Sequence, residues 1–168
     1  MIEVRRAGEE ELEFIAGCGR VINHEISESV QRRIPWFTGK RLNDLVSLIG
    51  LLKGKCVGFL NMFPIEIFPW GPVGKELFVI TCLFVTWDYQ NNGVGKRMMS
   101  SAIDIAMSSS GKGVILFGYT DPKWYLPVSF FEKLDLSEIS RNGEERLMML
   151  VLSSKAEIPR QIVSKYTY

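Results

Sequence analysis

The sequence predicts a single domain of the α/β (α+β) class, built on a central mixed sheet. Residues 77–85 form an apolar run rich in β-branched and aromatic side chains, as expected for a buried strand. A turn with two glycines and an amphipathic helix follow, and a second buried strand is expected at residues 113–119. These elements make a right-handed parallel βαβ unit. Hairpin patterns on both sides of this unit add antiparallel strands to the sheet.

The composition is that of an ordinary globular protein of 168 residues, with 46% hydrophobic residues. The net charge of +1 lacks the basic excess typical of nucleic-acid binding. No apolar run is long enough to span a membrane, and the strand pattern at residues 2–6 leaves no room for a signal peptide. We therefore expect a cytoplasmic protein without nucleic-acid or membrane partners, with its domain at residues 1–152 and a polar C-terminal tail at 153–168.

The three cysteines, Cys18, Cys56 and Cys82, are odd in number, far apart and set mostly among apolar residues. This pattern is typical of buried thiols in a reducing compartment, and it fits neither a disulfide framework nor a metal-ligand set. No metal is expected.

The N-terminal part is expected to contribute a strand and two helices. Residues 2–6 alternate between apolar and charged side chains, as a strand does. Acidic residues begin a short helix at 9–17, where they complement the helix dipole. A second helix can form over residues 20–34, and we expect Pro35 to end it within an aromatic loop at 34–39.

A hairpin is expected next. Residues 42–52 fit a helix or a strand, and we favour a strand from Leu45. The reason is that a turn at 53–55 leads into an apolar segment, 56–63, that can pair back on it. Three prolines then make residues 64–74 an irregular loop before the central strand.

The central helix and the C-terminal elements complete the predicted domain. The helix is expected to end at Gly111, which suits a C-cap. A short helix is expected at 128–134, and strands are expected at 136–139 and 146–152 around an Asn-Gly turn. The apolar stripe of the central helix comprises Met98, Met99, Ala102, Ile103, Ala106 and Met107.

The turn between the central strand and its helix has the properties of an anion site. The first N–H groups of a helix have no partner within it, and the helix dipole adds partial positive charge there. Gly93 and Gly95 have no Cβ that would block a ligand from these groups. A diphosphate is the expected ligand. Further donors around the same point are Gln90, Asn91, Asn92 and Lys96.

Two well-known phosphate-binding motifs are absent from this turn. The sequence has neither the Gly-x-x-x-x-Gly-Lys-Ser/Thr spacing of a P-loop nor the three glycines of the dinucleotide fingerprint. What remains is Gln-x-x-Gly-x-Gly after a buried strand, at residues 90–95. This segment resembles the pyrophosphate loop of the GNAT superfamily of acyl-CoA N-acyltransferases. The alternative is a plain strand-to-helix turn that binds nothing.

A second segment supports the resemblance. Residues 129–136 are similar to the family's late Phe-Tyr-Glu-Lys-x-Gly-Phe segment, beginning with Phe130-Phe131-Glu132-Lys133 in this chain. The order of predicted elements over residues 2–152 also resembles the whole GNAT fold. The resemblance therefore implies a splayed parallel strand pair in the central sheet, with helices on both faces.

The resemblance further implies acetyl-CoA as the co-substrate. Its pantetheine arm would add to the main chain of Leu83, Phe84 and Val85 like a further strand. Phe130 and Phe131 would pack along the pantetheine, with core packing as their alternative role. The residues that would hold the pyrophosphate are Gln90, Asn91, Asn92, Gly93, Val94, Gly95 and Lys96.

The residues that carry protons in many family members are replaced in this chain. Val79 stands where a glutamate often serves as the base, and Phe131 stands where a tyrosine often protonates the thiolate. Tyr125 and Glu66 are the candidate substitutes, as acid and base. Their alternatives are a plain loop tyrosine and a solvated carboxylate. Bound water can also serve, or the protein binds CoA without turnover.

The sequence thus predicts an N-acetyltransferase that moves an acetyl (acyl) group from acetyl-CoA to a primary amine by direct attack. The alternative is a catalytically weak or inactive CoA-binding regulatory module of the same fold. The acceptor is expected to be a small-molecule or peptide amine, and exposed edge strands would allow a homodimer.

Overall fold

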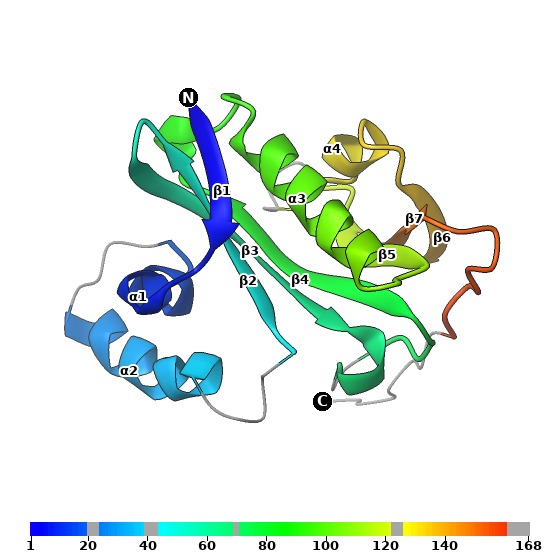
Figure 1. The fold of residues 1–168 in the computed structure, drawn as a ribbon, viewed down its shortest axis with the longest axis horizontal. Helices are drawn as coiled ribbons and strands as arrows, with labels where there is room; N and C mark the ends of the chain where they lie inside the picture. Colours follow the sequence, from blue (N-terminus) through cyan, green and yellow to red (C-terminus); the bar gives the residue numbers. More distant parts are fainter. Residues whose placement is uncertain (20–23, 39–43, 69–70, 122–125, 161–168) are drawn as a thin grey trace. The chain divides into compact units, whose positions relative to one another are not determined.

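The computed structural model describes residues 1–19, 24–38, 44–68, 71–121 and 126–160. The strands are β1 (Ile2–Arg6), β2 (Val46–Leu52), β3 (Lys55–Pro64), β4 (Leu77–Val85), β5 (Gly113–Tyr119), β6 (Ser137–Asn142) and β7 (Glu145–Val151). They belong to one sheet with the order β1-β2-β3-β4-β5-β7-β6 (Figure 1). Because β4 and β5 are parallel while the hairpins are antiparallel, the sheet is mixed, as predicted.

The chain divides into two units. The first unit comprises Met1–Met62 and Cys82–Ala102, and the second comprises Phe63–Thr81 and Ile103–Tyr168. In the first unit, β1 pairs with β2 and β2 with β3, all antiparallel. Gly50 lies opposite Gly58, and a bulge shifts the register directly after Gly50. The predicted N-terminal strand and hairpin are therefore confirmed.

Among the described residues, the helical elements before the hairpin are η1 (Glu9–Glu11), α1 (Leu12–Ala16) and the longer α2 (His24–Thr38). The prediction that Pro35 ends the second helix is wrong, because α2 contains Pro35 and continues to Thr38. A proline inside a helix removes one backbone hydrogen bond and crowds the preceding turn. Phe37, two residues later, packs against the hydrophobic core of the first unit. This partial burial helps to offset the local cost, and residues 34–38 are helical where an aromatic loop was predicted.

The core of the first unit lies between α1 and one face of β2 and β3. Ile15 packs with Ile49 and Phe59, and each of the three is at most 1% exposed. The ring of Phe14 meets Phe59 edge-on, and the ring of Phe84 lies tilted against Phe59, both with centroids 5.9 Å apart. Aromatic packing thus ties α1, β3 and the end of β4 together.

The second unit is built on the parallel pair and on a C-terminal hairpin. β4 pairs with β5 from Leu77 opposite Gly113 to Ile80 opposite Leu116, while β4 itself continues to Val85. β5 pairs along its length with β7, which pairs with β6. The bounds predicted for the two parallel strands are confirmed, and those of the hairpin strands differ by one to three residues.

A cluster of buried side chains forms the core of the second unit. It receives residues from β4, β5 and β7, and from η3 (Ile65–Ile67), which lies within the predicted irregular loop. α4 (Val128–Glu132) lies beside β5, where its Val128 comes close to Gly118. The six members of the cluster are Ile65, Leu77, Val79, Ile115, Leu147 and Met149.

The central helix, α3 (Val94–Ser108), ends differently from the prediction. Ser110, not Gly111, takes the left-handed conformation, with φ 61°. The Gly111 N–H donates to the Ala106 carbonyl at 2.7 Å. A Cβ on Gly111 would lie 2.8 Å from that carbonyl oxygen and from the Phe78 ring, so glycine is needed there for space. Met107, expected in the apolar stripe, is 57% exposed.

The predicted polar tail packs on the second unit as far as Arg160. Arg160 and Val73 exchange two backbone hydrogen bonds of 2.9 and 2.7 Å. Pro159 is buried, and Ala156 packs against the core cluster of this unit. Residues 153–160 therefore act as a strap on the second unit.

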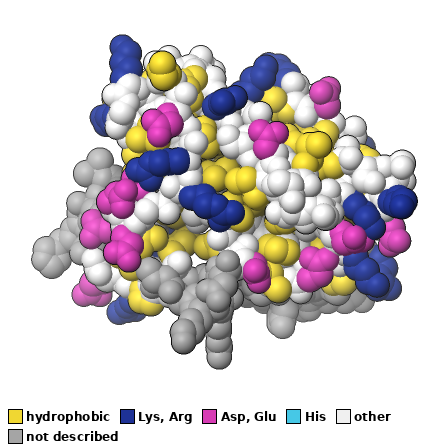
Figure 2. All heavy atoms as spheres, in the orientation of Figure 1, with side chains coloured by type: hydrophobic (Ala, Val, Ile, Leu, Met, Phe, Trp, Pro, Cys, Tyr) yellow, Lys and Arg dark blue, Asp and Glu magenta, His cyan; other side chains and the backbone are white. Residues whose placement is uncertain are grey.

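The surface is mixed in charge. Figure 2 shows basic and acidic side chains interspersed with apolar and neutral ones on the face that it draws. Among the helices of the described residues, none is both long and apolar enough to cross a membrane.

A buried carboxylate holds β1 to η1. Glu11 is 7% exposed and accepts hydrogen bonds from both Nη atoms of Arg5, at 2.7 and 3.1 Å, and from the Gly8 N–H at 2.8 Å. Burial alone raises the pKa of Glu11, but these hydrogen bonds and the Arg5 charge outweigh it. The pKa of Glu11 therefore lies below its ordinary value.

We expect Glu11→Gln to lower the free energy of unfolding at neutral pH by about 2 kcal/mol, since charge-assisted hydrogen bonds are lost. Because folding lowers the pKa of Glu11, the advantage of the wild type is complete above the ordinary value of 4.5. It disappears as the pH falls through the lower, folded-state pKa. Urea unfolding between pH 7 and pH 2 measures this, and a difference that does not change with pH would contradict it.

We expect truncation after Leu152 to lower the melting temperature by about 5 °C or more, because it removes the strap from the second unit. Truncation after Arg160 is the matched control and retains every strap contact described above. Thermal unfolding followed by circular dichroism compares the two. Equal melting temperatures for the two truncated proteins would show that the strap contributes nothing to stability.

Candidate functional site

The end of β4 is tied to β3 by a short turn. Thr86 donates two hydrogen bonds to the Val57 carbonyl, from its backbone N–H at 2.9 Å and from its hydroxyl at 3.1 Å. A 3-10 turn, η4 (Trp87–Tyr89), follows, and the Tyr89 N–H closes it on the Thr86 carbonyl at 2.9 Å. The Trp87 side chain is 75% exposed. The backbone is therefore fixed where it leaves the strand, while the indole faces solvent.

A lysine fastens the same turn to the β2–β3 hairpin. The Lys55 Nζ donates to the Tyr89 hydroxyl at 2.9 Å and lies 5.0 Å from the centroid of the ring. The hydrogen bond to Tyr89 raises the pKa of Lys55 above its ordinary value. This contact was not predicted, because residues 53–55 read only as a turn and carry no signal of a partner.

The loop after η4 has the backbone of an anion site. Asn91 and Gly93 take left-handed conformations, with φ of 60° and 82°. α3 begins at Val94, and its first helical hydrogen bond runs from the Arg97 N–H to the Gly93 carbonyl at 3.0 Å. The N–H groups of residues 94–96 precede that bond, so helix geometry gives them no acceptor within α3. They offer hydrogen-bond donors at the positive end of the helix dipole.

The side-chain amides of the loop donate hydrogen bonds to nearby backbone carbonyls. The Gln90 Nε2 donates to the Val85 carbonyl at 3.1 Å. The Asn92 Nδ2 donates to the carbonyls of Tyr89 and Gln90, at 3.2 and 3.0 Å. Both amides therefore brace the loop in this structure, and their predicted contact with a pyrophosphate stays a prediction.

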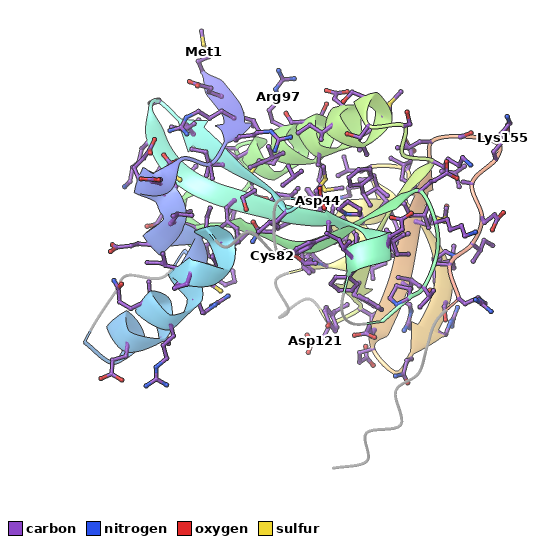
Figure 3. All side chains as sticks on the ribbon, turned by 60° about the horizontal axis from the view of Figure 1, so that its bottom comes forward. Met1, Asp44, Cys82, Arg97, Asp121 and Lys155 are labelled. Atoms are coloured by element: carbon purple, nitrogen blue, oxygen red, sulfur yellow. The ribbon has the colours of Figure 1, made fainter. Side chains whose placement is uncertain are left out.

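Basic side chains lie at the first turn of α3. Lys96 and Arg97 are both exposed, and Figure 3 shows Arg97 projecting from the helix. Positive charge at this place adds to the positive end of the helix dipole. A ligand with two or more negative charges suits the loop better than a neutral one.

The strand before the loop presents the three residues predicted to receive the pantetheine. Leu83 is buried, and Phe84 and Val85 are half-buried. The Val85 carbonyl already accepts the Gln90 amide, and a carbonyl oxygen has a second lone pair for a further donor. Residues 83–85 and 90–96 thus lie together in the first unit.

The other predicted site residues belong to the second unit or lie outside the described residues. Phe131 is 0% exposed and Phe130 is half-buried, with their rings 5.2 Å apart and nearly perpendicular. Core packing is therefore the observed role of Phe131. Val79 is 1% exposed within the core cluster. Tyr125 lies outside the described residues.

Glu66 holds the backbone of the second unit. Its Oε1 accepts a hydrogen bond from the Glu76 N–H at 2.5 Å. Glu76 has a positive φ of 57°, which is uncommon for a residue with a side chain. Its carboxylate forms an ion pair with Lys112. Glu66 thus supports the turn that leads into β4, and its predicted role as a base stays a prediction.

Comparison with known families identifies the architecture. Residues 13–127 match the model of the acetyltransferase (GNAT) family. Among curated protein sequences, none matches this chain.

Solved structures give the same fold at low sequence identity. PaiA N-acetyltransferase from Thermoplasma acidophilum, in complex with coenzyme A, has 14% identity and a TM-score of 0.64, with coverage of 90% of this chain and 99% of that one. Aminoglycoside 6′-acetyltransferase type Ii has 13% identity and a TM-score of 0.65, with coverage of 92% and 99%.

Ribosomal-protein-alanine N-acetyltransferase from Brucella melitensis has 12% identity and a TM-score of 0.65, with coverage of 89% and 99%. At such identities these likenesses show the fold. The match to the family model extends over more than half of the residues and includes both the parallel strand pair and the glycine loop. The chain belongs to the acetyltransferase (GNAT) family.

Proposed function

We propose that this chain transfers an acetyl group from acetyl-CoA to a primary amine by direct attack of the amine on the thioester. The observation that carries the proposal is the loop between β4 and α3. It combines left-handed backbone at Asn91 and Gly93 with the first turn of a helix and two exposed cations. These features suit the pyrophosphate of CoA. The coenzyme A in the Thermoplasma acidophilum structure supports the same ligand class.

The end of β4 supplies the second half of the proposed site. The main chain of residues 83–85 would hydrogen-bond the pantetheine arm and orient the thioester carbonyl. The amine nitrogen would form a bond to the acetyl carbon and lose a proton, the carbon–sulfur bond would break, and CoA would leave as a thiolate that takes up a proton. Holding both reactants in place supplies much of the rate in such a reaction. The half-buried Phe130 is the aromatic residue that we propose packs along the pantetheine.

An acyl-cysteine route receives no support from the cysteine nearest to this strand end. Cys82 lies within β4 (Figure 3), and burial raises its pKa to about 12. The thiol is therefore protonated at neutral pH, whereas nucleophilic attack needs the thiolate. Direct attack by the amine fits this environment better.

The proton carriers are proposed by elimination. Buried apolar side chains occupy the two positions at which many family members place a glutamate and a tyrosine, since Val79 is 1% and Phe131 0% exposed. We propose Tyr125 as the acid and Glu66 as the base, with bound water as the substitute for either. The acceptor is a small-molecule or peptide amine, and we propose a cytoplasmic location.

The burial of Val79 and Phe131 is also compatible with one alternative function. A CoA-binding regulatory module without turnover needs no proton carriers. Buried apolar side chains at Val79 and Phe131 are compatible with such a module. Formation of an acetylated product separates the two functions.

The strands β1 and β6 form the edges of the sheet and are the proposed surfaces for a homodimer.

Calorimetric titration with acetyl-CoA tests the loop. We expect the wild type to bind and Gly93→Glu to show no measurable binding, because the new carboxylate repels the pyrophosphate. Gly143→Glu is the matched control. It places the same charge at a glycine with φ 57° in the β6–β7 turn, where a Cβ would meet no atom within 4 Å. The two variants share the cost of a side chain in the left-handed region, about 1 kcal/mol.

Absence of binding to a folded wild type would exclude the acyltransferase function. Loss of binding in both variants would show that strain, and not the local charge, is responsible.

Steady-state kinetics with a panel of amines tests the proton carriers. We expect Tyr125→Phe and Glu66→Gln each to lower kcat by about a hundredfold while KM for acetyl-CoA stays unchanged. The glutamine retains an oxygen that can accept the Glu76 N–H, so the contact of the carboxylate is preserved without its basicity. Unchanged kcat in both variants would assign proton transfer to water. A wild type that binds acetyl-CoA but acetylates no amine would favour the regulatory module.

A further inference from the structure

Two glycines face each other beneath the first turn of α3. Gly50 of β2 is opposite Gly58 of β3 in the register of the hairpin. Because side chains alternate along a strand, both positions face away from Ile49 and Phe59, which pack on α1. Val94 and Met98 of α3 lie over the glycines, and both belong to the buried core.

The space above Gly50 is filled by the residue that opens α3. A Cβ on Gly50 would lie 2.6 Å from the Val94 Cγ1 and 3.1 Å from the Met98 Sδ. Carbon atoms in contact pack at about 3.5–4.0 Å, so an alanine would force Val94 away from β2. Val94 directly follows Gly93 of the anion loop. The absence of a side chain at Gly50 therefore fixes the position of the loop.

The space above Gly58 is filled by backbone. A Cβ on Gly58 would lie 2.6 Å from the Phe84 carbonyl oxygen, 3.0 Å from the Met98 Cε and 3.2 Å from the Val85 Cγ2. The methionine can rotate, but a carbonyl within a strand cannot move without its neighbours. An alanine at this position would therefore displace the end of β4.

We propose that Gly50 and Gly58 are positioning residues, each of which fixes one half of the CoA site. Gly50 sets the place of the pyrophosphate loop, and Gly58 sets the place of the strand end that receives the pantetheine. This inference rests on the proposed function. Because the two glycines face each other in one register, they fix the distance between the loop and the end of β4. A ligand with a pyrophosphate and a pantetheine can then contact the loop and the strand end at the same time.

Two ligands separate the two roles. CoA carries the pyrophosphate and the pantetheine, whereas ADP carries the pyrophosphate without the pantetheine. We expect Gly50→Ala to weaken the binding of both ligands about tenfold, since a misplaced group loses its contacts steeply with distance. We expect Gly58→Ala to weaken CoA binding about tenfold and to leave ADP binding within about twofold. Calorimetric titration of each folded variant gives both dissociation constants.

Gly54→Ala is the matched control for a general loss of stability. Gly54 lies in the turn of the same hairpin with φ 81°, and a Cβ there would meet no atom within 4 Å. An alanine at Gly54 strains the backbone without touching α3 or β4, so both ligands should bind as they do to the wild type. The pair Gly50→Ala/Val94→Ala removes the Cγ1 that clashes, and we expect it to bind ADP as tightly as Val94→Ala alone.

The outcomes are distinct. A wild type that does not bind CoA overturns the proposed function and this inference with it. If the wild type binds while Gly50→Ala and Gly58→Ala retain its affinities, or lose both ligands to the same extent as Gly54→Ala, only the inference is overturned. If Gly50→Ala does not fold, the double variant decides. Recovery of folding and of ADP binding supports the positioning role, and a folded double variant that does not bind ADP contradicts it.

Discussion

The close contact of α3 with the β2–β3 hairpin is the constraint on which the first unit depends. A helix usually packs on the side chains of a sheet. Here the first turns of α3 pack directly on the backbone of two facing glycines, Gly50 and Gly58. The strand end, the loop and the helix must then fit within a short length of chain. The left-handed residues Asn91 and Gly93 allow this, because they turn the backbone sharply before the helix begins.

The same constraint explains how the loop uses its polar side chains. The amides of Gln90 and Asn92 donate to the carbonyls of Val85, Tyr89 and Gln90, at and after the end of β4. The turn is further fixed from outside by Thr86 on Val57 and by Lys55 on Tyr89. A loop held in this way loses little freedom when a ligand binds, so the binding free energy is not spent on ordering it.

Much of the fold could be predicted because buried strands appear in the sequence as continuous runs of apolar residues. β4 and β5 are apolar along their length, and their bounds follow directly. Local rules failed where packing overrode them. Pro35 lies inside α2, whose Phe37 packs half-buried against the core of the first unit. Gly111 is required for space against Phe78, while Ser110 takes the left-handed position.

The loop of the candidate site was predictable for a similar reason. The Gln-x-x-Gly-x-Gly spacing located the loop, since glycine spacing is a local property of the chain. The bracing role of the amides depends on where the loop carbonyls point, and the pairing of Gly50 with Gly58 depends on strand register and a bulge. A bulge shifts the register directly after Gly50, and the apolar pattern of the two strands does not locate that bulge. The proton carriers depend on the positions of side chains from distant segments and could not be deduced from spacing.

The exposed indole of Trp87 has a practical consequence. It lies on η4, three residues before Gln90, in a turn fixed at both ends by Thr86 and Tyr89. Its ring is surrounded mainly by water, so its emission should respond to a charged or aromatic group that arrives nearby. The chain contains four tryptophans, and a version that keeps Trp87 alone would carry a built-in optical probe beside the loop. Occupancy of this part of the protein could then be followed in real time without a label.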